Sequence, residues 1–572
     1  MGPSAILLQC INAADDQDVA CPCLETASLP VELCLAHEDS MNSRSLFPRP
    51  ENEPTCNYAE GTDALTKLRT HLADRTVVEI PAVVGGKKIF SDDVEIIHAP
   101  HDRSRVLARV HRPSQAQVDD AIRSNLEAAH DWSRMDFADR AAIMHRAAGI
   151  VRGRLRHRIN AATMLGQSKT LDEAEADSAC ELIDFLHFNT FNAQQIVTDQ
   201  PLSVQDAQNR CDWRPLEGFV YAVSPFNFTA IGTNLSCAPA LMGNTVLWKP
   251  SNKSTWSNYL FFEALEEAGL PPGVINFVPG EASLVTDAVF ASRHFAGLHF
   301  TGSSEVFRSL WKRAATGIAA YRTFPRIVGE TGGKDFVLVH RSADAREVAV
   351  ALLKGSFGYQ GQKCSAASRA YMPASLWPKV KSILCDLMAQ VRIGDVADVS
   401  TFMGAVIDQN SYRRLGDALG AAKADSQVKV VAGGTFQDEV GYFVQPTVLQ
   451  VEDPSHRLMK DELFGPVLSV FEYPDSAWTE VLEAVDSVSD YALTGSIFCT
   501  DRAALKQAQD ALLHAAGNLY LNDKPTGAIV GQQPFGGGRA SGTNDKAGSW
   551  MNLLRWTSPR VVKETYAPPR GL

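Results

Sequence analysis

Apolar residues recur with helical spacing in the first part of the chain and in short strand-like runs after it. A capping box predicted at 114–117 opens a stretch in which apolar residues recur every third or fourth position to about residue 195. Beyond it, apolar runs such as 218–223 and 274–278 alternate with helical segments such as 254–268. This order of strand, loop and helix predicts an α/β fold, a parallel sheet with helices on its faces.

The loops that follow the predicted strands are where a ligand is expected, because parallel sheets bind ligands at the carboxyl ends of their strands. These loops lie at 224–228, 249–252 and 301–305, and a second α/β stretch covers about 326–515. The sequence contains neither a Gly-x-Gly-x-x-Gly fingerprint nor a complete phosphate loop. The usual nucleotide signatures therefore do not identify the ligand.

Composition and charge narrow the class of protein. The 572 residues are 45% hydrophobic and 21% charged, as in ordinary globular proteins, and the formal net charge is −12. An acidic chain repels phosphate backbones, so no nucleic-acid partner is expected. No run of eighteen apolar residues occurs, so no membrane span is expected either.

The first 51 residues differ from the rest and are predicted to form an acidic, flexible leader. Residues 1–50 carry seven acidic residues and two arginines, the reverse of a mitochondrial presequence. The pair Cys21 and Cys23 has no second pair at ligand spacing, and no metal site is predicted in the chain. The odd total of eleven cysteines favours reduced thiols over a disulfide framework.

Two segments carry candidate catalytic groups. Cys364 follows a glycine-rich turn and is predicted to lead into a helical stretch, where a nearby cation and helix-terminal N–H groups would favour a nucleophilic thiolate. The alternative is a buried structural cysteine. Glu330 is flanked by glycines at a strand end, where it can serve as a general base or lie as a solvated loop carboxylate.

Two further segments suggest an oxyanion donor and a cofactor contact. Asn227 lies just past a strand, so its amide can donate to an oxyanion or cap the next helix. Glu462 can accept ribose hydroxyls, and Phe464 can lie against a nicotinamide. The alternative for this second segment is a tight turn with a packed phenylalanine.

The combination and order of these segments resemble the aldehyde dehydrogenase superfamily over about residues 52–568. The family pattern places a Glu-x-Gly-Gly-Lys strand end about thirty residues before a cysteine. The resemblance implies a Rossmann-type NAD-binding domain, an α/β catalytic domain and a small β oligomerisation flap. It also implies a catalytic set of Cys364, Glu330 and Asn227. The implied cofactor-binding residues are Lys249, Ser251, Gly302, Ser303, Ser304, Glu305, Val306, Glu462 and Phe464.

Further motifs resemble the branch of this family that oxidises glutamate γ-semialdehyde to glutamate through a cysteine thioester, the second step of proline breakdown. They include Asn-Asp-Lys-Pro-Thr-Gly at 522–527 and Ile-Val-Gly-Gln-Gln-Pro-Phe-Gly-Gly at 529–537. The substrate-binding residues that this resemblance implies are Ser365, Gly527, Ala528, Phe228, Phe535 and Glu181. Three alternatives stay open, namely a CoA-acylating enzyme, an enzyme for another semialdehyde, and an inactive NAD-binding relative.

The resemblance divides the chain into parts. We expect the following boundaries: the leader at 1–51, the NAD-binding domain at 52–197 and 219–325, the catalytic domain at 326–515, a substrate-anchoring loop region at 516–546, and the oligomerisation flap at 198–218 and 547–568.

Cofactor choice, assembly and location are also expectations of the resemblance. NAD is the expected cofactor, but Asn252 would not repel a 2′-phosphate, so NADP is not excluded. The flap predicts a homodimer or a higher homo-oligomer. The family resemblance implies the mitochondrial matrix, whereas the leader does not support it, and the cytoplasm is the alternative.

Overall fold

The computed structural model describes residues 46–571 and contains two seven-stranded sheets. In the first sheet, β7 to β11 run parallel and β2 and β3 add an antiparallel edge. The strand order is β11-β10-β7-β8-β9-β2-β3, with β2 (Ala82–Val84), β3 (Lys87–Ile89), β7 (Phe219–Val223), β8 (Thr245–Lys249), β9 (Ile275–Phe277), β10 (Phe295–Thr301) and β11 (Arg326–Glu330).

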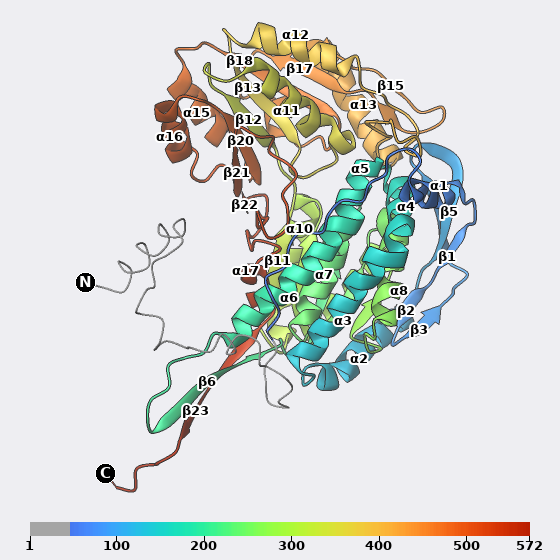
Figure 1. Cartoon of the computed structure of the whole chain (residues 1–572), viewed down its shortest axis with the longest axis vertical. Helices are drawn as coiled ribbons and strands as arrows, with labels where there is room; N and C mark the ends of the chain where they lie inside the picture. The colour runs from blue at the N-terminus through green and yellow to red at the C-terminus, as the bar shows by residue number, and fades with distance from the viewer. Residues whose placement is uncertain (1–45, 572) are drawn as a thin grey trace, which may run out of the picture. The chain divides into compact units, whose positions relative to one another are not determined.

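The second sheet is parallel except for its edge strand β14. Its order is β14-β17-β18-β13-β12-β20-β21, with β12 (Asp335–Val339), β13 (Ala367–Pro373), β14 (Val428–Ala432), β17 (Thr447–Val451), β18 (Val467–Tyr473), β20 (Thr494–Phe498) and β21 (Asn518–Leu521). Helices α11 (Ala345–Phe357) and α12 (Trp377–Met388) pack on one face, and α13 (Gln409–Ala424), α15 (Trp478–Ser487) and α16 (Arg502–Ala511) pack on the other (Figure 1).

Alternate residues of the first sheet face two separate cores. In β7, Phe219 and Tyr221 belong to one cluster, whereas Val220 and Ala222 belong to the other, as the two-residue period of a strand requires. The first cluster includes α2 (Gln115–Trp132), α9 (Ala282–Ala291) and α10 (Ser304–Thr316). The second includes α3 (Phe137–Ile150), α6 (Leu182–Thr198), α7 (Thr229–Leu241) and α8 (Thr255–Glu267). The α/β class is confirmed, and so is the capping box that opens α2.

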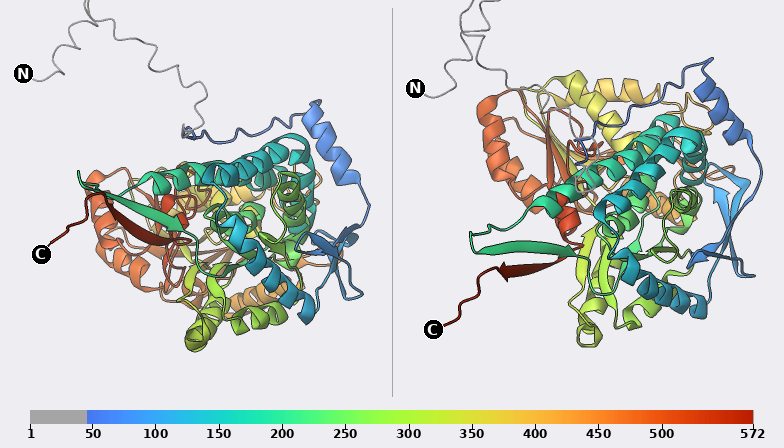
Figure 2. Two further views of the ribbon diagram at one scale, coloured as in Figure 1. Left: turned by 90° about the horizontal axis from the view of Figure 1, so that it is seen from below. Right: turned by 60° about the horizontal axis from the view of Figure 1, so that its bottom comes forward.

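Within residues 46–571, four smaller sheets lie outside the large ones, and two of them are short pairs: β15 (Phe436–Gln437) with β16 (Phe443–Val444), and β19 (Tyr491–Ala492) with β22 (Gly538–Arg539). A three-stranded sheet consists of β1 (Val78–Ile80), β4 (Val94–Ala99) and β5 (Asp102–His111) and follows α1 (Asp63–Ala73). Strands β6 (Ala207–Arg214) and β23 (Ser558–Thr565) pair antiparallel and extend away from the sheets (Figures 1 and 2). This pair joins the two ranges in which the sequence predicts a flap.

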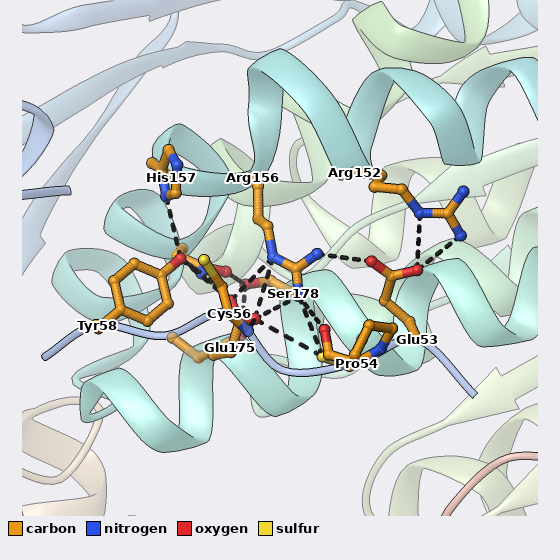
Figure 3. A network of polar contacts seen from close by, with 12 residues as sticks. Glu53, Pro54, Cys56, Tyr58, Arg152, Arg156, His157, Glu175 and Ser178 are labelled. Atoms are coloured by element: carbon orange, nitrogen blue, oxygen red, sulfur yellow. Dashed lines mark hydrogen bonds and ion pairs between the residues drawn. The ribbon is translucent and has the colours of Figure 1, made fainter. Parts of the chain in front are cut away.

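The segment Phe47–Tyr58, here called the N-terminal strap, is tied to the helices before β6 by charged side chains. Glu53 forms ion pairs with Arg152 and with Arg156 of α4 (Arg156–Gln167), and Arg156 also pairs with Glu175 (Figure 3). The backbone N–H of Cys56 donates to Glu175 at 2.7 Å. The strap is thus held by interactions across more than one hundred residues of sequence.

Most of the predicted leader, with Cys21 and Cys23, lies outside the described residues. Across residues 46–571, none of the helices has the length and apolar character needed to cross a membrane. The same range contains no group of three or more His, Cys, Asp or Glu side chains arranged to bind a metal ion. The seven cysteines in this range are all free thiols.

Candidate active site

A cavity of about 1120 Å³ opens at the carboxyl ends of β7 and β10, where the predicted ligand loops meet. The structure brings candidate residues from five separate stretches of sequence to this cavity. Those that line it are Asn227, Ser251, Gly302, Ser303, Ser304, Glu305, Val306, Cys364, Glu462 and Phe464.

Cys364 lies in a turn, and the structure corrects the predicted helix after it. The next element is strand β13, which starts at Ala367. The thiol is therefore not placed at the start of a helix. Protein atoms enclose the side chain on most sides, and this burial raises the pKa of the Cys364 thiol well above its usual value, with further contributions from Asp335 and Glu330.

Glu330 is the last residue of β11 and faces the loop that precedes α17 (Trp550–Leu554). Its backbone bridges Gly542 in an antiparallel fashion. Burial raises the pKa of its carboxyl well above the usual value, although a hydrogen bond from the Gly537 N–H opposes the shift. Its Oε2 atom is buried without a hydrogen-bond partner in the described part of the chain. A carboxyl with a raised pKa and an unused oxygen suits a group that exchanges protons.

Asn227 reaches toward the turn that carries the cysteine. It is 4% exposed, and its Nδ2 donates to the carbonyl oxygen of Gln362, two residues before Cys364, at 3.0 Å. The amide nitrogen carries two hydrogens, so one remains for another acceptor. The loop after β7 and the turn before β13 are thereby joined at the cavity.

Glu462 and Phe464 form one wall of the cavity. The carboxylate of Glu462 accepts a hydrogen bond from the Gly333 N–H at 2.9 Å, and burial raises its pKa to about 7. Phe464 adopts a left-handed backbone conformation, with φ at 50°. Its ring packs edge-on against the ring of Phe226, with 5.8 Å between the ring centroids. The strained backbone places this ring in the cavity, and such strain is typical of functional sites.

Lys249 ends β8 but lies just outside the cavity lining. It is 7% exposed, donates to the carbonyl oxygen of Pro250 at 3.3 Å, and has a pKa lowered to about 8 by burial. Glu95 of β4 lies nearby, and its Oε2 accepts a hydrogen bond from Asn252 Nδ2 at 2.6 Å. Sequence reasoning missed Glu95, because more than 150 residues separate it from Asn252 and no local pattern links them.

The start of α10 lines the cavity. Ser303 caps the helix by accepting from Val306 N–H at 3.3 Å, and Gly302 N–H donates to the carbonyl oxygen of Glu330 at 3.2 Å. Ser304 and Glu305 occupy the first turn. A helix start of this kind favours an anionic group such as a pyrophosphate.

The predicted substrate residues fall into two groups. Ser365 forms a hydrogen bond with Thr526 through their hydroxyls at 2.8 Å, which joins the cysteine turn to the loop of Gly527 and Ala528. Gly527 has φ at 93°, a conformation that favours glycine. The structure thus brings Ser365 next to the loop that contains both predicted backbone donors.

Phe228, Phe535 and Glu181 have different surroundings. The ring of Phe228 faces the ammonium group of Lys169, and Phe535 pairs through its backbone with Ala547. Glu181 ends an irregular helical segment, Glu175–Glu181, and burial raises the pKa of its carboxyl, with a further contribution from Asp177. Within residues 46–571, the rings of Phe228 and Phe535 do not pack against each other.

The donor set of the cavity fits a dinucleotide. A helix start can bind its pyrophosphate, carboxylate and ammonium groups can bind its riboses, and a ring lies where a nicotinamide can stack. When bound, NAD supplies an acceptor for a hydride ion.

Comparison with known proteins agrees with these features. The profile of the aldehyde dehydrogenase family matches residues 91–562. The chain is 47% identical to "Delta-1-pyrroline-5-carboxylate dehydrogenase, mitochondrial" of Dictyostelium discoideum over 92% of this chain and 95% of that one. It is also 47% identical to the Homo sapiens protein of the same name, over 90% and 92%.

A solved structure gives the same result at the level of the fold. The NAD-bound Delta-pyrroline-5-carboxylate dehydrogenase from Mycobacterium tuberculosis superposes with a TM-score of 0.90 at 47% identity, covering 93% of this chain and 98% of the other. The agreement in sequence extends over nearly the full described chain and includes the cavity. This chain belongs to the aldehyde dehydrogenase family.

Proposed function

We propose that the protein oxidises L-glutamate γ-semialdehyde, the open form of Δ1-pyrroline-5-carboxylate, to L-glutamate with NAD as the hydride acceptor. The observation that carries this proposal is that Cys364 and Asn227 line one cavity together with the start of α10. The names of the relatives and the NAD-bound neighbour support the substrate and the cofactor. In this proposal the enzyme acts in the second step of proline breakdown.

In the first half of the reaction, Cys364 acts as the nucleophile. The thiol proton passes to solvent water, the sulfur bonds to the aldehyde carbon, and the carbonyl oxygen becomes an oxyanion. The amide of Asn227 and the backbone N–H of Cys364 donate to this oxyanion. Such donors are most effective when they are held in place beforehand, as the bond from Asn227 to Gln362 holds this amide. Loss of hydride from the tetrahedral carbon leaves a thioester on Cys364.

In the second half, Glu330 acts as the general base. It takes a proton from a water molecule, which attacks the thioester carbon and releases glutamate and the Cys364 thiol. The raised pKa of its carboxyl makes the carboxylate a stronger base for this step. A CoA-acylating enzyme would use a thiol in place of water and would not need this base.

The substrate's two ends have separate binding groups in this proposal. Ser365 and the backbone N–H groups of Gly527 and Ala528 bind the α-carboxylate. Phe228 and Phe535 enclose the aliphatic stem, and Glu181 lies toward the α-ammonium group. Lys249, Ser251 and Glu462 bind the riboses, Gly302 to Val306 bind the pyrophosphate, and Phe464 packs against the nicotinamide.

We also propose a homodimer or higher homo-oligomer formed through the β6–β23 pair. Leu202, Val204 and Val561 are 85%, 60% and 69% exposed in or beside this pair, and such apolar surface favours association. The mitochondrial matrix is the proposed location, supported by the names of the relatives.

A substrate comparison tests the proposed activity. NADH formation is followed by absorbance with pyrroline-5-carboxylate, succinate semialdehyde and glutaraldehyde in parallel. We expect the highest kcat/KM with pyrroline-5-carboxylate, because the other two lack the α-amino acid head. Equal or higher kcat/KM with succinate semialdehyde would assign a different substrate. Absence of turnover with all three, with NAD binding retained, would favour a non-catalytic relative.

A further inference from the structure

A buried cation lies behind the cavity wall. Lys169 follows α4 and is fully buried, and its Nζ pairs with Asp177 at 2.8 Å. The same Nζ faces the ring of Phe228 at 3.9 Å and the ring of Tyr359 at 4.7 Å. Removing an ammonium group from water is unfavourable unless partners compensate for the lost hydration. Here an anion and two aromatic faces supply that compensation.

The anionic partner fixes the start of α7. Asp177 Oδ2 accepts from the Thr229 N–H at 2.9 Å, and Oδ1 accepts from the Ala230 N–H at 2.8 Å. These are the first two residues of α7, so Asp177 acts as a cap supplied from another part of the chain. Asn227 and Phe228 come immediately before them. The position of the proposed oxyanion donor therefore depends on Asp177.

The second aromatic partner belongs to the other side of the cavity. Tyr359 and Gln360 both have left-handed backbones, with φ at 51° and 57°, in the turn Gly358–Gly361 that precedes Cys364. Gln360 Nε2 donates to the carbonyl oxygen of Ser168, the neighbour of Lys169, at 2.8 Å. Lys169 is thus joined to the cysteine turn through its side chain and through the backbone beside it.

We propose that Lys169 is a positioning residue, which holds the Asn227–Phe228 segment and the Cys364 turn in register through Asp177, Phe228 and Tyr359. This inference rests on the proposed function, in which Asn227 and Cys364 act on the same carbonyl group. Lys169 does not contact the reacting atoms in this role. The ammonium group of Lys169 binds the ring faces of Phe228 and Tyr359. Its ion-pair partner Asp177 binds the first turn of α7.

The relative position of Asn227 and Cys364 matters because both act on the same carbonyl group. A displacement of about 1 Å between a nucleophile and its supporting donor lowers the rate by about 100-fold. Loss of Lys169 also leaves the Asp177 carboxylate buried without its cation, which weakens the cap of α7. The effect should therefore reach every aldehyde, whatever its head group, and should leave the cofactor half of the cavity unchanged.

The test compares Lys169→Met with Lys169→Arg in the full chain. Methionine has a similar length but no charge, whereas arginine keeps the cation for the carboxylate and for the rings. A double variant, Lys169→Met with Asp177→Asn, removes both charges and covers the case in which the single variant fails to fold. Arg156→Met is the matched control, because it also removes a buried cation from the same helical layer, one whose ion pairs are with Glu53 and Glu175.

We expect Lys169→Met to lower kcat/KM by about 10- to 100-fold with pyrroline-5-carboxylate and by the same factor with glutaraldehyde. The NAD dissociation constant, measured by fluorescence titration, should stay the same. Lys169→Arg should recover most of the activity, and the double variant should not recover it.

Three outcomes would overturn the proposal. If Lys169→Met lowers kcat/KM only with pyrroline-5-carboxylate and not with glutaraldehyde, Lys169 binds the head of the substrate directly. A loss no larger than that of Arg156→Met, at equal folded fraction by circular dichroism, would mean a purely structural role. Wild-type protein that oxidises neither aldehyde would remove the proposed function and this inference with it, an outcome distinct from the first two.

Discussion

The reaction cavity and the N-terminal strap both enclose carboxyl groups, yet the two regions treat them in opposite ways. In the strap network, burial would raise the pKa of Glu53 and Glu175, but hydrogen bonds from arginines outweigh it and lower both values. At the candidate active site, burial raises the pKa of Glu462 in the cavity wall and of Glu330 near Cys364, and backbone N–H groups only partly oppose it.

The difference lies in how the nearby cations are used. Arg156 is 7% exposed and pairs with both Glu53 and Glu175. Beside Glu330, Lys546 lies close enough to lower the pKa of that carboxyl, but its Nζ donates to Gly517 O, Gly536 O and Asn518 Oδ1. Acids paired with arginines join segments of the chain, whereas acids without an ion-pair partner have raised pKa values, which suit proton exchange. The comparison predicts that the first group serves stability and the second serves activity.

The largest effect on activity is expected from a substitution in the cavity. Cys364→Ser replaces the sulfur with a far weaker nucleophile at neutral pH, and we expect NADH formation to fall by roughly 1000-fold or more. Because the side chain changes little in size, the melting temperature measured by circular dichroism should stay the same. Retained turnover would remove Cys364 from the mechanism, and a large fall in melting temperature would contradict the division between the two regions.

The next effect separates the two halves of the reaction. Glu330→Gln removes the proposed base but keeps the shape, so hydrolysis of the thioester should slow by about 100-fold or more while its formation continues. Rapid kinetics should then show a burst of NADH equal to the number of active sites. Hydroxylamine, which cleaves thioesters, should restart NADH formation. A slow rise without a burst, in a variant that binds NAD normally, would assign the base to another group.

In the strap, removal of the shared cation should change stability rather than activity. Arg156→Met leaves Glu53 and Glu175 buried without that partner, and we expect a loss of about 3 to 5 kcal/mol in the free energy of unfolding. Urea denaturation measures this loss. The kcat and KM of the folded fraction should match those of the wild type. A change in KM for the aldehyde at equal folded fraction would show that the strap contributes to the active site.

Local patterns and the order of the motifs predicted individual helices and strands and the candidate catalytic residues. The period of β7 and the capping box of α2 are visible as patterns of apolar and polar residues, and the motifs around Cys364 and Glu330 are continuous stretches of sequence. The helix predicted after Cys364 was wrong. Small residues there suit a helix, but β13 lies between β12 and β18 and pairs with both, and this tertiary pairing overrides local preference.

The charge networks could not be predicted in this way. Arg156 meets Glu53 across 103 residues, and Asn252 meets Glu95 across 157. Lys169 and Asp177 are only eight residues apart, but their link to Thr229 depends on how α7 packs. Each of these contacts depends on the folded arrangement of helices and strands, for which a single sequence shows no pattern.

The smallest effect is expected in the pH dependence of stability, measured for one acid from each region, Glu53 and Glu462. Glu53→Gln removes charge-assisted hydrogen bonds from Arg152 and Arg156. We expect the free energy of unfolding to fall by about 1.5 to 3 kcal/mol near neutral pH. Because the folded pKa of Glu53 lies below the unfolded value of 4.5, its stabilising contribution is present above pH 4.5 and disappears as the pH falls through the folded value. The difference between this variant and the wild type should therefore shrink in acid.

Glu462→Gln should behave in the opposite way. The folded pKa of Glu462 is raised to about 7 from a usual value of 4.5, so this carboxyl increasingly destabilises the fold as the pH rises from 4.5 to 7. The variant should thus gain stability relative to the wild type over that interval, as measured by urea denaturation in cofactor-free protein at a series of pH values. If both variants instead lose stability together as the pH rises, the acids of the cavity are structural like those of the strap, and the division between the two regions does not hold.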